Sequence, residues 1–216
     1  MTQWIIPPKF PFRGVVFDMD GLMIDTERVI RYSWDVMGEK MGYVRFGDNI
    51  FQTLGMSRVQ RNHYFLEKYG EDGYHQVYEA YERQKGIPRK KGLLELLELL
   101  KSREIPMAVA TSTHQEHSIP ELKKQGIFSY FSAVITGNMV KRGKPDPEIY
   151  RTACEQLRIL PEETLALEDS YNGIRSAAGA GLKVIMVPDL LVDEKPVQEC
   201  IYGKMESLAA VAQWIF

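Results

Sequence analysis

Val15-Val16-Phe17-Asp18-Met19-Asp20-Gly21 is the most informative stretch of the 216-residue sequence. The run VVFDM (15–19) predicts a buried strand that ends in two carboxylates, and a turn-forming glycine follows. Carboxylates this close repel one another when both are ionised, which suggests a shared cation or different tasks for the two acids. Taken alone, the segment fits equally well a turn that merely ends a strand or caps a helix.

Further apolar runs alternate with amphipathic helical patterns along the chain. The apolar runs are MAVAT (107–111), AVIT (133–136), LALE (165–168) and VIMVP (184–188), and the clearest helical patterns span 92–103, 145–158 and 172–181. Strands that alternate with helices predict an α/β fold with a Rossmann-like, doubly wound parallel sheet. In such a fold the carboxyl ends of the strands meet at one edge.

Residues 28–87 interrupt this alternation. They are dense in aromatic and charged residues, lack a β-branched run and indicate several amphipathic helices. We therefore expect a Rossmann-like core formed by residues 1–27 and 88–216, with residues 28–87 inserted as an α-helical cap domain. An insert directly after the first strand should lie over the edge of the sheet where open α/β sheets bind ligands.

Composition narrows the classes of partner. The 27 basic and 29 acidic residues give a net charge of -2, which offers no overall attraction to nucleic acid or to an anionic membrane. No segment approaches the roughly 18 unbroken apolar residues of a membrane-spanning helix. Cys154 and Cys200 show no metal-binding or redox spacing, which fits a reducing compartment. We expect a cytoplasmic protein, monomeric in the absence of a heptad repeat, with no nucleic-acid or membrane partner.

Polar residues follow three of the other predicted strands at the same edge. They are Thr111-Ser112-Thr113, Lys144 within the segment 143–147, and the acid pair Glu168-Asp169. Each has an ordinary structural interpretation, because hydroxyls and acids often cap helices and most lysines are solvated. An acid pair, a hydroxyl, a lysine and a second acid pair at one sheet edge together favour a site for Mg²⁺ and a phosphoryl group.

The segments FDMDGLMIDTE (17–27), ATST (110–113), GKPDP (143–147) and LEDSYNGIRSAAGAG (167–181) resemble the four signature motifs of the haloacid dehalogenase superfamily. A helical insert between the first and second motifs, together with the DTE extension Asp25-Thr26-Glu27, resembles the β-phosphoglucomutase-like phosphatases with a small helical cap. The resemblance spans essentially the whole chain. It implies a Mg²⁺-dependent phosphatase that hydrolyses a small phosphorylated metabolite, a sugar phosphate or a nucleotide-like monoester, through an aspartyl phosphate.

The resemblance also implies roles for individual residues. Asp18 matches the nucleophile and Asp20 the general acid and base. Thr111, with the backbone amide of Ser112 beside it, matches the group that holds phosphoryl oxygens, and Lys144 matches the lysine that balances their charge. Mutation of either aspartate should therefore abolish or stall turnover.

For the metal, the resemblance implies ligands from both acid pairs. Asp18, the backbone carbonyl of Asp20 and Asp169 match the Mg²⁺ ligands of the superfamily, and Glu168 is a further candidate. Two more residues are candidates for substrate binding. Arg58 matches a cap arginine that grips a non-reacting phosphate in some relatives, although a solvated arginine at a helix start is an equal alternative. His114 follows the second motif near the expected mouth of the site.

Two other functions remain open from the sequence. A phosphohexomutase of the β-phosphoglucomutase type would use the same aspartyl phosphate, and the GxSR context of Arg58 is mutase-like. Mutases of this branch usually carry a hinge histidine where this chain has Ile30, which favours hydrolysis. A non-catalytic protein that binds phosphorylated metabolites on the same fold is the second alternative, and the intact Asp18 and Asp20 argue against it.

Overall fold

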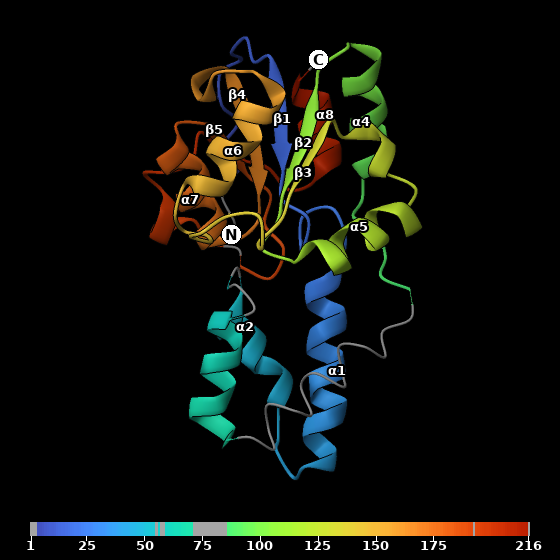
Figure 1. Ribbon diagram of the computed structural model, residues 1–216, viewed down its shortest axis with the longest axis vertical. Helices are drawn as coiled ribbons and strands as arrows, with labels where there is room; N and C mark the ends of the chain where they lie inside the picture. Colours follow the sequence, from blue (N-terminus) through green and yellow to red (C-terminus); the bar gives the residue numbers. More distant parts are fainter. Residues whose placement is uncertain (1–3, 55, 57–58, 71–85, 192, 216) are drawn as a thin grey trace.

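The computed structural model describes residues 4–54, 56, 59–70, 86–191 and 193–215. A sheet with helices on both faces forms one part of the molecule, and a smaller group of helices lies beyond one end of the strands (Figure 1). Among the described residues, none of the helices combines the length and the apolar character needed to cross a bilayer.

The sheet is parallel, with its strands in the order β3-β2-β1-β4-β5-β6. Its strands are β1 (Gly14–Phe17), β2 (Met107–Ala110), β3 (Ala133–Ile135), β4 (Thr164–Glu168), β5 (Lys183–Met186) and β6 (Gly203–Lys204). The chain winds from β1 outward through β2 to β3, then returns to β4 on the other side of β1. The direction of winding reverses between β1 and β4, and open α/β sheets bind ligands at such a switch point.

Two hydrophobic clusters cover the two faces of the sheet. Val15 and Phe17 of β1 belong to one cluster and Val16 to the other, as the alternation of side chains along a strand requires. The first cluster packs α4 (Leu93–Ser102), α5 (Gln115–Lys124) and α8 (Leu208–Ile215), and the second packs α6 (Glu148–Leu157) and α7 (Tyr171–Ala180). The predicted fold class, a doubly wound Rossmann-like sheet, is confirmed.

Several element boundaries differ from the predicted ones. The helix expected from residue 145 begins at Glu148, whose amide donates a hydrogen bond to Asp146 Oδ1 at 3.0 Å. The strands expected to reach Met19 and Thr111 end at Phe17 and Ala110. The chain therefore leaves the sheet just before these polar side chains.

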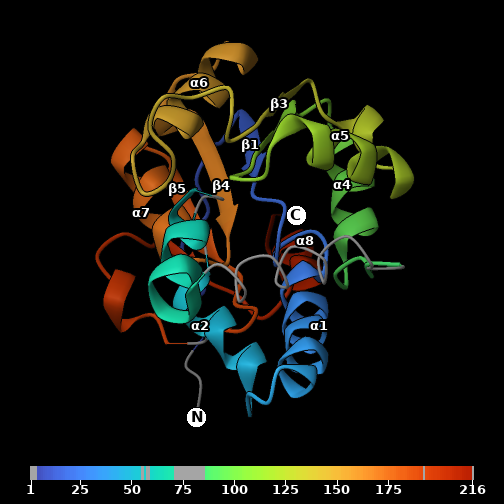
Figure 2. The same cartoon turned by 60° about the horizontal axis from the view of Figure 1, so that its bottom comes forward.

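The segment inserted after β1 is helical. It contains α1 (Thr26–Lys40), a short 3-10 turn η1 (Phe46–Asn49), α2 (Ile50–Thr53) and a further helical stretch at 59–70. Ile30, Trp34, Phe46, Ile50 and Phe65 form a hydrophobic cluster of their own within it. These helices lie together on the side toward which the strands point (Figure 2).

Two linkers join the insert to the sheet, and they pair with each other. Ile24 and Arg89 form an antiparallel bridge, flanked by backbone hydrogen bonds from Asp25 to Pro88 at 2.8 Å and from Lys90 to Met23 at 2.9 Å. The insert is thus held by a short two-stranded connection beside the loop that follows β1.

Candidate active site

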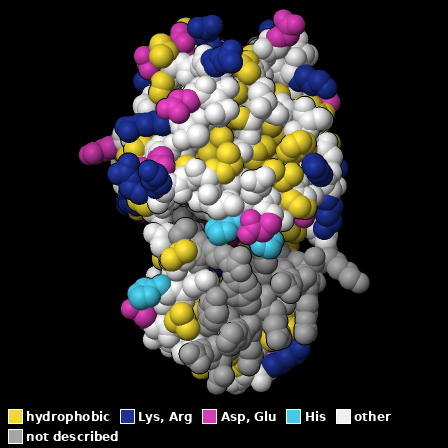
Figure 3. Space-filling view, viewed as in Figure 1, with side chains coloured by type: hydrophobic (Ala, Val, Ile, Leu, Met, Phe, Trp, Pro, Cys, Tyr) yellow, Lys and Arg dark blue, Asp and Glu magenta, His cyan; other side chains and the backbone are white. Residues whose placement is uncertain are grey.

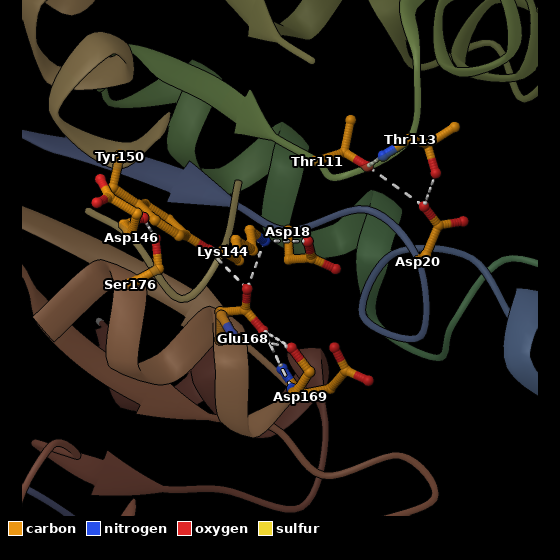
Figure 4. A network of polar contacts seen from close by, with 12 residues as sticks. Asp18, Asp20, Thr111, Thr113, Lys144, Asp146, Tyr150, Glu168, Asp169 and Ser176 are labelled. Atoms are coloured by element: carbon orange, nitrogen blue, oxygen red, sulfur yellow. Dashed lines mark hydrogen bonds and ion pairs between the residues drawn. The ribbon is translucent and has the colours of Figure 1, made fainter. Parts of the chain in front are cut away.

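The ends of β1, β2 and β4 bring the predicted residues to one edge of the sheet. Asp18 follows β1 directly, Thr111 follows β2, and Glu168 is the last residue of β4. The loop before α6 contributes Lys144, whose side chain reaches back toward β1 and β4 (Figure 4). The sheet order makes β1 and β4 neighbours, so segments 150 residues apart in sequence supply the two acid pairs.

Lys144 is the centre of the site. Its side chain is only 2% exposed, and its Nζ lies 2.5 Å from Asp18 Oδ1 and 2.6 Å from Glu168 Oε1. Burial by itself lowers the pKa of Lys144, but the charges and hydrogen bonds of the two carboxylates outweigh burial and hold the pKa above its ordinary value. The ammonium therefore stays charged at neutral pH in a place that excludes water.

The surroundings of Asp18 and Asp169 disfavour the ionised forms of both carboxyl groups. Burial raises the pKa of Asp18 well above its ordinary value, against the opposing effect of Lys144. Burial and the neighbouring charges of Asp18 and Glu168 raise the pKa of Asp169 in the same direction. Asp169 Oδ1 is buried without a hydrogen-bond partner among the described residues. A buried, unpartnered carboxylate oxygen is costly unless something positive binds to it.

The donor set suits a divalent cation. Carboxylate oxygens of Asp18, Glu168 and Asp169 all lie within 4.8 Å of one another, and all three residues are buried. When ionised, three carboxylates against the single ammonium of Lys144 leave two negative charges, which one Mg²⁺ would balance. Hard cations of this kind prefer oxygen ligands. The residues therefore fit the metal that the sequence predicts.

Glycines allow the loops to approach these carboxylates closely. A side chain at Gly21 would place its Cβ 2.3 Å from Asp169 Oδ2, and one at Gly173 would place it 1.6 Å from Glu168 Oε1. Gly21 also has φ +86°, a conformation that L side chains rarely adopt. Both glycines are needed because the loop after β1 and the start of α7 close over the acid pair.

Both oxygens of Glu168 already have protein partners. Oε1 accepts hydrogen bonds from Lys144 and, at 2.8 Å, from the Tyr150 hydroxyl. Oε2 accepts from the amides of Asp169 and Ser170 at 3.0 and 3.1 Å and from the Ser170 hydroxyl at 3.1 Å. This geometry makes Glu168 an anchor for Lys144 and for the start of α7, and its role as a metal ligand stays a prediction.

Asp20 points away from Asp18 and toward the end of β2 (Figure 4). Its Oδ2 accepts hydrogen bonds from Thr111 Oγ1 at 3.3 Å and from Thr113 Oγ1 at 2.7 Å. The amide of Thr113 in turn donates to Thr111 Oγ1 at 3.0 Å. Thr113 was not among the predicted site residues, although a second hydroxyl two residues after Thr111 was visible in the sequence.

The three predicted substrate-binding residues lie in different places. Ser112 is half-buried at the end of β2, with its carbonyl oxygen packed so closely on Gly137 that a Cβ there would lie 2.2 Å from it. His114 precedes α5, and its Nδ1 lies 3.3 Å from Glu116 Oε1. Arg58 lies outside the described residues.

A cleft of about 490 Å³ opens beside Asp20. It runs between the linkers and α5, and it is lined by Met19, Asp20, Ile24, Thr26, Ile87, Thr113, Glu116, His117, Pro120, Glu121 and Lys124. Histidine and acidic side chains gather at this junction between the sheet and the insert in the space-filling view (Figure 3). The cleft gives a small molecule access to the carboxylate of Asp20.

Two further residues near the site received no role from the sequence. Tyr150 of α6 is fully buried, and burial together with the charges of Glu168 and Asp18 raises the pKa of its hydroxyl well above the usual value. The hydroxyl therefore stays protonated as a donor to Glu168. Glu27 of α1 is buried at the junction, where burial raises its pKa to about 7. An aromatic residue in a helical pattern is usually structural, so Tyr150 did not stand out, whereas Glu27 belongs to the motif at 17–27 without an assigned role.

Comparisons with known proteins show the family to which the chain is similar. Residues 15–187 match the model of the haloacid dehalogenase-like hydrolase family. The chain is 32% identical over 179 residues to the phosphorylated carbohydrates phosphatase of Thermotoga maritima, covering 80% of this chain and 83% of that protein. It is 27% identical over 201 residues to the phosphoglycolate phosphatase of Thiobacillus denitrificans, covering 88% of each.

A solved structure shows the same arrangement over nearly the whole chain. The crystal structure of CbbY from Rhodobacter sphaeroides in complex with phosphate superposes with a TM-score of 0.75 at 26% identity. The match covers 93% of this chain and 96% of that one. The likeness therefore includes the inserted helices as well as the sheet.

Proposed function

This chain belongs to the haloacid dehalogenase-like hydrolase family, and on that premise we propose that it is a Mg²⁺-dependent phosphatase of small sugar-type phosphate monoesters. The observation that carries the proposal is the Lys144 ammonium, buried between Asp18 and Glu168. It places a positive charge against a carboxylate at the switch point of the sheet. A nucleophile surrounded by positive charge is what phosphoryl transfer requires.

In the first proposed step the Asp18 carboxylate attacks phosphorus. A bond forms between an Asp18 oxygen and phosphorus while the bond from phosphorus to the leaving oxygen breaks. Asp20 gives its proton to that oxygen, so the alcohol departs neutral and Asp18 carries an acyl phosphate. Lys144 opposes the rise that burial causes in the pKa of Asp18, and it offers positive charge to the phosphoryl oxygens.

The second step returns the enzyme to its starting state. Asp20, now a carboxylate, takes a proton from a water molecule as the water oxygen attacks phosphorus. The bond between Asp18 and phosphorus breaks, and inorganic phosphate leaves. Thr111 and Thr113 hold Asp20 at the mouth of the cleft, where both the leaving oxygen and the incoming water can reach it.

The residues that would hold Mg²⁺ are Asp18, Asp169 and the backbone carbonyl of Asp20, with Glu168 behind them. A bound Mg²⁺ would supply positive charge that balances the buried acids and the phosphoryl oxygens. We propose the Ser112 amide as a further donor to those oxygens and His114 as a residue at the rim. Arg58 stays a candidate for substrate binding.

We propose that residues 28–87 act as a cap over a core of residues 1–27 and 88–216. The separate hydrophobic cluster of the insert supports this division, since it lets the helices move as one body. The paired linkers between them form a short hinge. A cap over the carboxyl ends of the strands would exclude water while the alcohol leaves.

The alternative of a phosphohexomutase is less well supported. At the hinge position where mutases of this branch carry a histidine, Ile30 is 3% exposed and packs within the hydrophobic cluster of the insert. An apolar side chain there offers no proton and no hydrogen bond to a sugar hydroxyl. Hydrolysis is therefore the function we favour over transfer to a second sugar position.

The proposal is tested with purified protein and a panel of phosphorylated metabolites. We expect Mg²⁺-dependent release of inorganic phosphate from one or more sugar phosphates, and none from the Asp18→Asn variant. Interconversion of hexose 1- and 6-phosphates without phosphate release would indicate a mutase instead. Absence of turnover with every monoester, together with measurable binding, would favour the non-catalytic alternative.

A further inference from the structure

The first turn of α1 holds two buried polar atoms that lack partners. Thr26 and Glu27 are 2% and 4% exposed, and neither Thr26 Oγ1 nor Glu27 Oε2 has a hydrogen-bond partner among the described residues. Most buried polar side-chain atoms in folded proteins are hydrogen-bonded, because leaving one unpaired is costly. Two such atoms on consecutive residues indicate that another molecule supplies their missing hydrogen-bond partners.

A positive group faces Glu27 from another part of the insert. Arg61 lies in the helical stretch 59–70, and its Nε is likewise buried without a partner among the described residues. Its charge lowers the pKa of Glu27, while burial and the charge of Asp20 raise it. The carboxylate and the guanidinium are thus within electrostatic reach of each other, yet no hydrogen bond joins them.

Glu27 lies next to a residue that lines the cleft, and the charge of Asp20 acts on it. Thr26 lines the same cleft as Asp20 and Thr113, and Glu27 is the next residue along α1. Asp20 is the residue that would protonate the leaving oxygen. Whatever is attached to that oxygen must extend from Asp20 into this junction between the core and the insert.

We propose that Glu27 and Arg61 together bind hydroxyl groups of the leaving alcohol, so that the substrate is the phosphate of a polyol or sugar. A hydroxyl can donate to the carboxylate of Glu27 while a neighbouring hydroxyl accepts from the guanidinium of Arg61. An aromatic leaving group can do neither. This inference rests on the proposed phosphatase function and names the residues that select the alcohol.

The competing explanation is that Glu27 and Arg61 form a structural ion pair that stabilises the insert. The two explanations differ in the sign of the stability change. Removing the charge of a structural partner lowers stability, because it leaves the other charge buried and unpaired. Removing a carboxylate that awaits a ligand raises the stability of the free protein, at the expense of activity.

The experiment compares the wild type with Glu27→Gln and Arg61→Met, and uses Glu39→Gln as a matched control. Glu39 lies on the exposed, far end of the same helix. The kcat/KM is measured for a hexose phosphate that the wild type hydrolyses and for p-nitrophenyl phosphate. Melting temperatures of the free proteins are measured at pH 8.

We expect both site variants to lose roughly 10- to 100-fold in kcat/KM for the hexose phosphate, the effect of one charge-assisted hydrogen bond. The loss for p-nitrophenyl phosphate should be at least tenfold smaller. Glu27→Gln should melt at a higher temperature than the wild type. Equal losses for the two substrates, or a lower melting temperature of Glu27→Gln, would overturn the inference. Wild-type protein that hydrolyses neither substrate would instead refute the phosphatase function itself.

Discussion

At the scale of single residues, Lys144 shows how the site is built from conflicting charges. It is as buried as a core leucine, yet its ammonium contacts the carboxylates of Asp18 and Glu168. Asp169, which follows Glu168, has a buried carboxylate oxygen without a hydrogen-bond partner among the described residues. Each buried charge in this network is stabilised by the charged groups beside it. Substitution of one member therefore changes the ionisation of the others.

We predict that Lys144→Met abolishes phosphatase activity and destabilises the protein by about 3–5 kcal/mol, as is usual when one partner of a buried ion pair is removed. Without the ammonium, nothing opposes the effect of burial on Asp18, so its pKa rises further and the folded state holds its proton to higher pH. Stability should then fall more steeply with rising pH in the variant than in the wild type.

Urea unfolding at pH 5.5 and pH 8 measures this effect. Lys141→Met, at an exposed position of the same loop, is the control and should behave as the wild type. The additional change Glu168→Gln should restore part of the lost stability. A Lys144→Met variant with wild-type stability at both pH values would contradict the ion-pair account.

Glu27 gives a prediction about the wild type itself. Its pKa is about 7 in the folded protein against an ordinary 4.5, so between these values the folded state binds more protons than the unfolded one. Its contribution to stability is thus lost as the pH rises from 4.5 to 7. Glu27→Gln should gain on the order of 3 kcal/mol at pH 8 and nothing at pH 4, as measured by urea unfolding. An equal change at both pH values would show that ionisation of Glu27 is not the cause.

At the scale of elements, the site depends on which strand ends are neighbours. Because β1 and β4 pair, Asp18 and Asp169 repel one another at the switch point of the sheet. The strands and the acids at their ends can be predicted from the sequence, because a buried parallel strand is continuously apolar and polar residues follow it directly. The sixth strand was not predicted, because Gly203–Lys204 carries no such pattern.

We predict that Mg²⁺ raises the melting temperature of the wild type, by an amount equivalent to about 2.7 kcal/mol at a hundredfold excess over its Kd. The variant Asp169→Asn should melt higher than the wild type in EDTA, because it removes a like charge, and should lose the response to Mg²⁺. Differential scanning calorimetry with and without Mg²⁺ measures both effects. An unchanged Mg²⁺ shift in the variant would exclude Asp169 as a ligand.

The loop that follows β5 forms ion pairs with the linkers between the core and the insert. Asp189 accepts from Lys90 at 2.5 Å and also pairs with Arg28, while Asp25 pairs with the same two cations. Leu190, the next residue, packs against the hydrophobic cluster of the insert. The loop thus contacts both linkers and the insert at once.

We predict that Asp189→Asn loosens this hinge. Hydrogen exchange of the Asp25 and Lys90 amides, which close the linker pairing, should be faster than in the wild type. Exchange within β1 and β4 should stay unchanged, and the exposed substitution Glu199→Gln should have no effect on either region. Unchanged exchange at both linker amides would show that Asp189 does not hold the hinge.

At the scale of the whole molecule, the sequence predicted the sheet, the insert and the residues at the strand ends, because each depends on a local pattern. It did not reveal Tyr150 as part of the site, and it assigned no role to Thr113 or Glu27, which belong to the quoted motifs. Their importance arises only when folding places them against Asp20, Glu168 and Arg61. A residue that acts by positioning another residue has no local sequence pattern that identifies this role.

The whole molecule places the buried Asp18 at a switch point and Asp20 beside a cleft, with the inserted helices on the side toward which the strands point. Each part is explained if Asp18 becomes phosphorylated and Asp20 completes the reaction. In Asp20→Asn, p-nitrophenyl phosphate should still phosphorylate Asp18, because its leaving group needs little help from an acid. Hydrolysis of the acyl phosphate should then be slow, because the water lacks its base.

The most direct measurement is to quench this variant during turnover, reduce it with borohydride and map the product by peptide mass spectrometry. An acyl phosphate on Asp18 is reduced to homoserine at position 18, close to one equivalent per chain, and we predict this result. Homoserine at another position, or an unmodified Asp18 while p-nitrophenol is released, would contradict the central claim.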